Sequence, residues 1–563
     1  MVRGINLRGA VALNVITMIG IGPLVTIPLV LAQLAGPLAL AGWIVGALVA
    51  LCDGLVWAEL GSLYPGSGGT YAYLREAFGS QRWGRLLAFL FNWQFLLYAP
   101  FLLASGYIGF TDYLGYLLPS VAQQWTLHTA ASILVGIVVI VLLYRRVSAV
   151  AAIGSALAVA AVGTLLIVIA ASFSHANFHQ AFTLSKPVSL GAGFFAGLGG
   201  ALYIALYDYV GYSDAALLSD EVRVPHRTIP AAIIISIVIV AVLYVALQIG
   251  ILGAVPWQTL FDRGGNPTPQ SQFVASTAVA NAWGAWAARG VTLLILVTAF
   301  ASLFGNLAGF ARIPFAAARD GAFFRSFARL HPQGQFPHIS LLVIGVASLA
   351  ACFFDLGTVI AILTAGIVLI QSVAQIVALF VLRARGERAP FRMWLFPLPA
   401  LIALAGWLYA FAYTGTLAIG AGVGWLLVGL IAFLAMARAQ RTWPFLKRAV
   451  TTAIIAAVLI GAAIPARAQT QAPFFLYGAT FFYERIPKSQ WASALERYRA
   501  MGINTIDLYV MWNWHEPKPG EFDFSGRTNP RRDLAGLLKL IRGDGFKIVL
   551  RPGPVIRNEW RNG

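Results

Sequence analysis

Long apolar stretches dominate the first 440 residues, and short polar or basic segments separate them. A helix that crosses a bilayer needs about 20 mainly apolar residues, and this criterion predicts about twelve membrane-spanning segments. They cover residues 11–34, 38–60, 84–110, 128–144, 149–172, 192–218, 230–254, 288–311, 339–354, 358–382, 394–414 and 420–437. The pattern therefore predicts an all-α polytopic membrane protein with the lipid bilayer as its surroundings.

Basic residues sort to alternate loops between these segments. The arginine-rich loops lie near residues 3–8, 75–85, 145–146, 223–227, 312–329, 383–392 and 438–448, whereas the loops between them carry few basic residues. Cytoplasmic loops of membrane proteins carry an excess of Lys and Arg. We therefore expect a multi-pass protein of the cell (inner) membrane, with the N-terminus and the end of the twelfth segment in the cytoplasm.

The composition agrees with this interpretation and excludes others. Of 563 residues, 59% are hydrophobic and 11% charged, which is far from a soluble globular protein. The net charge of +18 is explained by the basic loops, so no nucleic-acid partner is expected. Cys52 and Cys352 lie in separate apolar runs and suggest no disulfide framework. No metal or cofactor is expected.

Two of the predicted segments are interrupted. Residues 20–28 (GIGPLVTIP) place two glycines and two prolines in the middle of the first segment, and residues 207–214 (YDYVGYSD) place two carboxylates and a glycine in the sixth. Irregular backbone at membrane depth is tolerated where it is buried in protein or lines a cavity. A simple proline kink would explain the first interruption alone. Two broken helices five segments apart instead indicate a 5+5 inverted repeat with a ligand site between the repeats.

Carboxylates within these segments are candidate site residues. Asp208 is a candidate partner for a substrate ammonium or a transported proton, because intramembrane carboxylates are costly and usually functional. The N-termini of the half-helices would favour an anionic group such as a substrate carboxylate. Asp214 is better explained by a hydrogen bond to a neighbouring helix than by a role in the site.

Several motifs follow one another in the order of a known family. They are residues 19–23 (IGIGP), 58–71 (AELGSLYPGSGGTY), 73–79 (YLREAFG), 220–230 (DEVRVPHRTIP), 318–321 (ARDG), 331–332 (HP) and 336–337 (FP). Over about residues 5–440 the chain resembles the amino acid/polyamine/organocation permeases. The resemblance implies that the unwound parts of the first and sixth helices hold the substrate. It assigns that role to Gly20, Ile21, Gly22, Tyr209, Gly211 and Tyr212.

The sequences of residues 22–28 and 52–59 resemble those of a branch of this family that is related to polyamine and amino acid uptake carriers. Some relatives use a lysine in the fifth helix as a proton-linked cation, and residues 148–172 contain none. Proton coupling would then use Asp208, Asp53 or Glu59, with sodium as the alternative ion. Asp53 is as well explained as a structural residue capped by backbone groups.

Residues 441–468 separate the permease-like domain (1–440) from a different kind of sequence (469–563). Lys447 and Arg448 precede an apolar run that ends in the Ala-Arg-Ala of residues 466–468, which is the pattern of a secretory signal peptide. The alternative is a thirteenth membrane segment. Both interpretations place the tail outside the cytoplasm.

The tail alternates short β-type runs with amphipathic helices. Strands are predicted at residues 475–480, 505–510 and 547–551, and helices at 489–501 and 533–542. This order predicts an α/β fragment of a (β/α)8 barrel, whose ligand residues come from the carboxyl ends of the strands.

Residues 483–487 (YERIP), 501–506 (MGINTI), 509–517 (YVMWNWHEP), 520–524 (GEFDF) and 551–554 (RPGP) resemble glycoside hydrolase family 35, the β-galactosidase-type retaining enzymes. The resemblance implies that Tyr509 and Glu559 hydrogen-bond a sugar ring, although Arg557 and Asn558 depart from the family's usual residues. Retaining hydrolysis needs two carboxyl groups about 5 Å apart, and in the family both come from later strands. The tail as given is therefore expected to be inactive, and a gene fusion or a lost stop codon would explain it.

These patterns predict a secondary active transporter of amino acids or polyamines, proton-coupled, with an incomplete glycosidase-like tail. The alternative is a membrane-anchored β-galactosidase-type glycoside hydrolase, if the sequence is a fragment of a longer protein.

Overall fold

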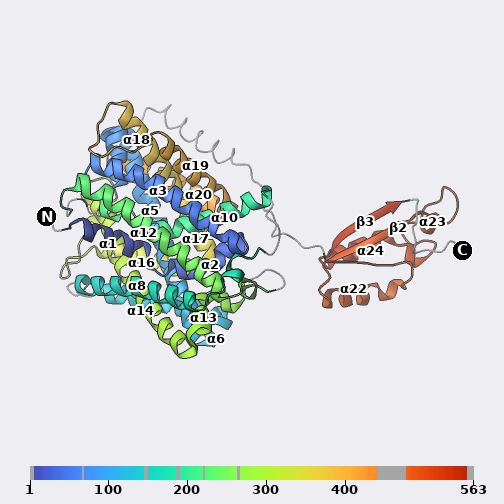
Figure 1. Ribbon diagram of the computed structural model, residues 1–563. Helices are drawn as coiled ribbons and strands as arrows, with labels where there is room; N and C mark the ends of the chain where they lie inside the picture. The colour runs from blue at the N-terminus through green and yellow to red at the C-terminus, as the bar shows by residue number, and fades with distance from the viewer. Residues whose placement is uncertain are drawn as a thin grey trace. The chain divides into compact units, whose positions relative to one another are not determined.

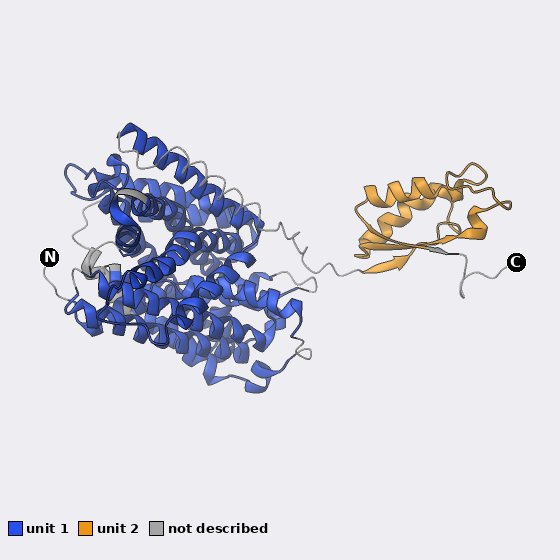
Figure 2. Cartoon of the chain, turned by 90° about the horizontal axis from the view of Figure 1, so that it is seen from above, with its two compact units in different colours: residues 1–466 blue, residues 467–563 orange. Residues whose placement is uncertain are grey.

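The computed structural model describes residues 5–65, 69–144, 150–184, 190–217, 219, 222–262, 267–440 and 477–553. The chain forms two compact units, residues 1–466 (unit 1) and 467–563 (unit 2), coloured separately in Figure 2. The predicted linking segment, residues 441–468, and the predicted sugar-binding Glu559 lie outside the described residues.

Helices joined by loops and turns make up the described residues of unit 1 (Figure 1). Its helices are α1 (Leu7–Met18), α2 (Gly22–Gln33), α3 (Ala39–Leu63), α4 (Thr70–Phe78), α5 (Gly84–Leu117), α6 (Pro119–Gln123), α7 (Trp125–Leu143), α8 (Val150–Ser174), α9 (Phe178–Phe182), α10 (Ala192–Tyr209), α11 (Asp214–Leu217), α12 (Pro225–Ala254), α13 (Val274–Trp283), α14 (Ala285–Phe310), α15 (Arg312–Arg319), α16 (His338–Ala351), α17 (Leu356–Ile367), α18 (Gln375–Ala384), α19 (Leu398–Tyr413) and α20 (Thr416–Ala439). A π-helical turn, Val368–Ala374, joins α17 to α18.

Among the described residues, seven helices are long and apolar enough to cross a membrane, and the bent pair of α1 and α2 would make an eighth. The seven helical stretches cover residues 36–63, 84–117, 125–143, 225–254, 285–319, 356–384 and 416–439. Three shorter apolar helices occupy residues 160–174, 338–351 and 398–413. The prediction of a polytopic membrane protein is confirmed.

Small residues allow the helices of unit 1 to approach closely. A methyl group at Gly42 in α3 would lie 2.7 Å from Cβ of Ala201 in α10, and one at Gly46 would lie 2.9 Å from Cβ of Ala205. Close contact through Gly and Ala is a common way for helices to associate in membranes, where lipid offers no hydrophobic driving force between them. α3 also packs along α12 and α19, while α5 packs against α14, α16, α17 and α20.

Unit 2 contains three parallel strands in the order β1 (Gly478–Thr480), β2 (Thr505–Met511) and β3 (Lys547–Gly553). The register pairs Gly478 with Thr505 and Thr505 with Lys547. The connecting helices are α22 (Trp491–Ala500) and α24 (Leu534–Gly543), with the short helix α23 (Trp512–His515) after β2. The described strands and both connecting helices lie where the sequence predicts them.

The core of unit 2 forms between the sheet and these two helices. α24 begins where the Asp533 carboxylate accepts a hydrogen bond from the Gly536 N–H at 2.9 Å, as expected for an N-cap. Buried apolar side chains of the helices meet those of the central strand. They include Trp491, Leu495, Ile506, Leu508, Leu537 and Ile541.

Candidate functional site

The first interruption falls where the sequence predicts it. α1 ends at Met18, α2 begins at Gly22, and the two helices are bent by 50°. No side chain caps the start of α2 with a hydrogen bond, and Pro23 has no N–H to contribute. The first N–H groups of a helix have no acceptor within it, and they form the positive end of its dipole. This positive helix end is buried inside unit 1, because Ile21 is 5% exposed.

The second interruption lies against the first. α10 ends at Tyr209, Val210 is extended, and Gly211 has φ of +127°, a conformation that other residues rarely adopt. A methyl group at Gly211 would lie 3.0 Å from the backbone nitrogen of Met18. The chain thus needs glycine here both for the turn and for the close approach of the two broken helices.

Polar side chains of α1 hold the second interruption in place. Asn14 is fully buried; its amide donates to the Tyr212 carbonyl oxygen at 2.7 Å, and its side-chain oxygen accepts from the Ala215 N–H at 2.9 Å. The Thr17 hydroxyl lies 3.2 Å from the Gly211 carbonyl oxygen. The sequence interpretation missed these residues, although an asparagine inside the first apolar segment was a usable signal.

Asp208 lies where the two interruptions meet. Its Oδ2 accepts a hydrogen bond from the Thr26 hydroxyl of α2 at 2.6 Å, and the residue is 3% exposed. A methyl group at Gly22 would lie 2.2 Å from Asp208 Oδ1, so the carboxylate packs directly on the start of α2. No group among the described residues donates a hydrogen bond to this Oδ1. The Tyr244 hydroxyl lies 2.7 Å from the Met18 carbonyl oxygen and 3.1 Å from that of Asp208.

The predicted tyrosines are buried, and their hydroxyls point to α3. The Tyr209 hydroxyl donates to the Trp43 carbonyl oxygen at 3.2 Å. The Tyr212 hydroxyl donates to Asp53 Oδ2 at 2.6 Å. Asp53, one of the predicted coupling residues, is therefore connected to the second interruption through a side chain. Gly20 lies against a different helix. A methyl group added at Gly20 would lie 3.4 Å from the Ser302 hydroxyl oxygen of α14.

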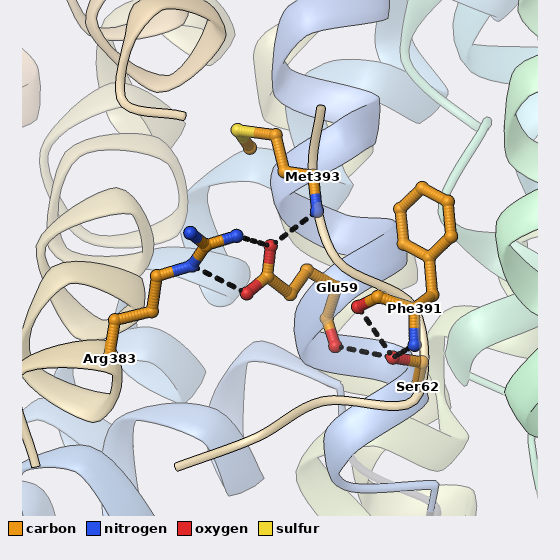
Figure 3. Close-up of polar contacts among 5 residues, drawn as sticks. All are labelled: Glu59, Ser62, Arg383, Phe391 and Met393. Atoms are coloured by element: carbon orange, nitrogen blue, oxygen red, sulfur yellow. Dashed lines mark hydrogen bonds and ion pairs between the residues drawn. The ribbon is translucent and has the colours of Figure 1, made fainter. Parts of the chain in front are cut away.

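Glu59 lies near the end of α3 and binds a distant segment (Figure 3). Arg383 of α18 donates to both of its oxygens, at 2.7 and 2.6 Å, and the Met393 N–H donates at 2.8 Å. One turn later the Ser62 hydroxyl accepts from the Phe391 N–H at 3.2 Å. The Glu59 side chain is 3% exposed, so this is a buried ion pair between α3 and α18, and the Met393 and Phe391 N–H groups add contacts from the segment that follows α18.

In unit 2, Tyr509 lies on β2 and its hydroxyl accepts a hydrogen bond from Arg551 of β3 at 3.2 Å. Arg551 also pairs with Asp507 at 2.9 Å. His515 is buried after β2, between the Tyr483 hydroxyl and the Asp523 carbonyl oxygen, both at 2.7 Å. Burial lowers the pKa of His515 below its usual value, although the contact with the Asp523 carbonyl opposes this shift. His515 is therefore held neutral at pH 7.

Nothing in the described part of the chain gathers three or more His, Cys, Asp or Glu side chains in a way that could hold a metal ion. The chemistry available at the meeting of the broken helices is that of the buried Asp208 carboxylate, a positive helix end and hydroxyl groups, with the buried Asp53 carboxylate reached through Tyr212. This combination suits non-covalent binding of a small polar solute or a proton.

Residues 469–563 match the glycosyl hydrolases family 35. The exo-beta-D-glucosaminidase of Pyrococcus horikoshii is 47% identical over 88 residues, which are 16% of this chain and 11% of that protein. The beta-galactosidase of Xanthomonas manihotis is 40% identical over 91 residues, 16% of this chain and 14% of that protein. The chain thus spans only between 11% and 14% of the length of these two glycosidases.

Residues 5–433 match the amino acid permease family. The serine/threonine exchanger SteT of Bacillus subtilis is 25% identical over 420 residues, which are 72% of this chain and 89% of that protein. The expected resemblance to permeases is confirmed over the same part of the sequence that holds both interrupted helices. The protein belongs to the amino acid permease family.

Proposed function

We propose that this protein is a secondary active transporter of amino acids or polyamines and that protons drive it. One observation carries the proposal: a buried carboxylate, Asp208, lies against the positive end of α2 where two interrupted helices meet. Half-helix ends and ionisable groups at membrane depth are typical of substrate and ion sites in transporters. The substrate would contact Gly20, Ile21, Gly22 and Asp208 from one side and Tyr209, Gly211 and Tyr212 from the other.

We further propose twelve spans arranged as a 5+5 inverted repeat. Between the two interruptions the chain makes the long helices α3, α5, α7 and α8, so each interruption would open one repeat. The basic loops would place the N-terminus in the cytoplasm and the transporter in the inner membrane.

Among the candidate coupling residues, the contacts favour Asp208 and Asp53 over Glu59. Both oxygens of Glu59 already bind Arg383, so its charge has a partner. Asp208 and Asp53 have no such cationic partner among the described residues, so protonation of either would remove an uncompensated buried charge.

The tail is proposed to be part of a (β/α)8 barrel that plays no role in transport. Its three parallel strands and two connecting helices are consistent with such a barrel. Tyr509 and Glu559 would contact sugar in it. Deletion of residues 449–563 should leave the rate of uptake unchanged, and a large loss would contradict this assignment.

The full-length protein in proteoliposomes tests the transport proposal. An inside-alkaline pH gradient should drive accumulation of at least one labelled amino acid or polyamine, and a protonophore should abolish it. Asp208→Asn should abolish this uptake, whereas Asp320→Asn, at an exposed position after α15, should not. Failure of every amino acid and polyamine to accumulate would overturn the proposal. Uptake that needs a sodium gradient and no pH gradient would show that sodium, and not the proton, is the coupling ion.

A further inference from the structure

The start of α2 is a position that attracts a carboxylate. Pro23 has no N–H and the Leu24 N–H donates to the Ile21 carbonyl oxygen at 3.0 Å, so the Gly22 N–H is the donor that this end offers, and no side chain caps it with a hydrogen bond. The helix has 12 residues, so its dipole contributes a positive partial charge at Ile21 and Gly22. A substrate that bears a carboxylate would bind here if the position were open.

The protein's own Asp208 carboxylate lies beside this position, although no described N–H group of α2 donates a hydrogen bond to its Oδ1. Its Oδ1 lies so close to Gly22 that a single methyl group there would meet it at 2.2 Å. Its Oδ2 is fixed by the Thr26 hydroxyl in the second turn of the same helix. A second carboxylate at the start of α2 would therefore lie within contact distance of the first.

The surroundings of Asp208 favour a cation instead. Oδ1 is buried and receives no hydrogen bond from any described group, so it is an acceptor without a donor. The Tyr207 ring lies beside it, because a methyl group at Gly22 would meet Tyr207 Cε1 at 3.3 Å as well as Asp208 Oδ1 at 2.2 Å. An ammonium group could satisfy the carboxylate, and aromatic rings add attraction for a cation.

We propose that the cargo binds as an organic amine without a carboxylate group and that Asp208 excludes amino acids from the start of α2. The inference rests on the proposed transport function and narrows its substrate class. An amine would bring a positive charge to the buried Asp208 carboxylate, which has no cationic partner among the described residues. An amino acid would bring a further carboxylate to the position beside Asp208, which two like charges at contact distance strongly disfavour.

Pairs of solutes that differ only in the carboxylate group test this inference. Labelled 1,5-diaminopentane and L-lysine form one pair, and ethanolamine and L-serine form the other. In proteoliposomes with the full-length protein, the amine of at least one pair should be taken up with a kcat/KM at least ~100-fold above that of its amino acid. Preferred uptake of the amino acids would overturn the inference but leave the transport function standing. Uptake of none of the four would overturn this inference, and the transport function itself is judged by its own wider panel.

The variant Asp208→Ala sharpens the test, because it opens the start of α2 without adding a group. Amine uptake should fall by ~100-fold or more and binding of L-serine should rise by ~10-fold, which reverses the preference. Asp320→Asn serves as the control and should keep the wild-type preference. Asp208→Ala protein that is folded, by size-exclusion profile, yet keeps the amine preference would contradict the assignment. If this variant does not fold, the solute pairs with the wild-type protein decide alone.

Discussion

Replacing Glu59 by glutamine tests how firmly the end of α3 is held to α18. Glu59→Gln removes the charge but keeps the shape, so the Met393 N–H keeps an acceptor while Arg383 loses its counter-charge. Removal of one partner from a buried ion pair costs ~3–5 kcal/mol, because the other charge is left uncompensated. The Arg383 side chain is 21% exposed, so water compensates part of the loss. We expect a destabilisation of about 2–4 kcal/mol.

The two cysteines provide the assay. Cys52 lies on α3, two turns before Glu59, and Cys352 lies at the end of α16; they are 6% and 3% exposed. Each thiol should react with a maleimide only when its helix opens locally. With one cysteine retained at a time, Glu59→Gln should accelerate labelling of Cys52 by about 30–1000-fold, since 1.4 kcal/mol is tenfold. Labelling of Cys352 should change much less.

A double-mutant cycle separates the ion pair from other effects of the substitution. Arg383→Gln alone should also be destabilising, and the double variant should lose about 2 kcal/mol less than the sum of the two single variants. Additive effects of the two substitutions would refute the reasoning. A Cys52 labelling rate in Glu59→Gln within about twofold of wild type would also refute it. The ion pair would then contribute no more to stability than an ion pair exposed to solvent.

Three further outcomes follow from the contacts. Gly22→Ala should lower uptake by ~100-fold, because the carboxylate that contacts Gly22 must move, whereas Gly420→Ala should stay within about threefold, since its methyl group meets no atom within 4 Å. Tyr212→Phe leaves the Asp53 carboxylate without its hydrogen bond and should cost about 1.5–3 kcal/mol in thermal unfolding measurements. The tail should lose stability as pH falls from about 6.5 toward 5, because His515 takes up a proton more easily when unfolded than when buried. Hydrogen exchange of the β2 amides, corrected for intrinsic rates, should show this loss, and His515→Gln should remove it.

The interrupted helices could be predicted because their residues stand out from an apolar background. Glycine and proline weaken a helix wherever they occur, and a carboxylate at membrane depth is costly without a role. Gly22 and Asp208 carried these signals in the sequence. That they touch could not be predicted, because the contact depends on how far each helix is rotated about its axis.

Other residues of the site gave little signal by themselves. Thr26 and Tyr244 are ordinary residues of apolar helices until their neighbours are known, and Tyr244 reaches the carbonyl oxygen of Met18 from 226 positions away. Glu59 stood out as a buried carboxylate, but its partner Arg383 is 324 positions further on and belongs to a cluster of arginines that the charge pattern cannot tell apart.

The polar contacts indicate which helices move together during transport. Asn14 joins α1 to the turn after α10, the Asp208 side chain joins α10 to α2, and Tyr244 of α12 lies within hydrogen-bond distance of both interruptions. These buried contacts are costly to break singly because each leaves an unsatisfied group. The broken helices and α12 are therefore expected to shift as one body, so any motion that exposes Asp208 must occur at the borders of that body.

The ion pair between Glu59 and Arg383 lies at one such border, because α3 packs along α10 and α12 while α18 continues from α17 beside α5. A transporter that opens there has to weaken this ion pair in each cycle. The free energy needed to break the ion pair therefore sets a lower limit on the free energy that cargo binding must supply.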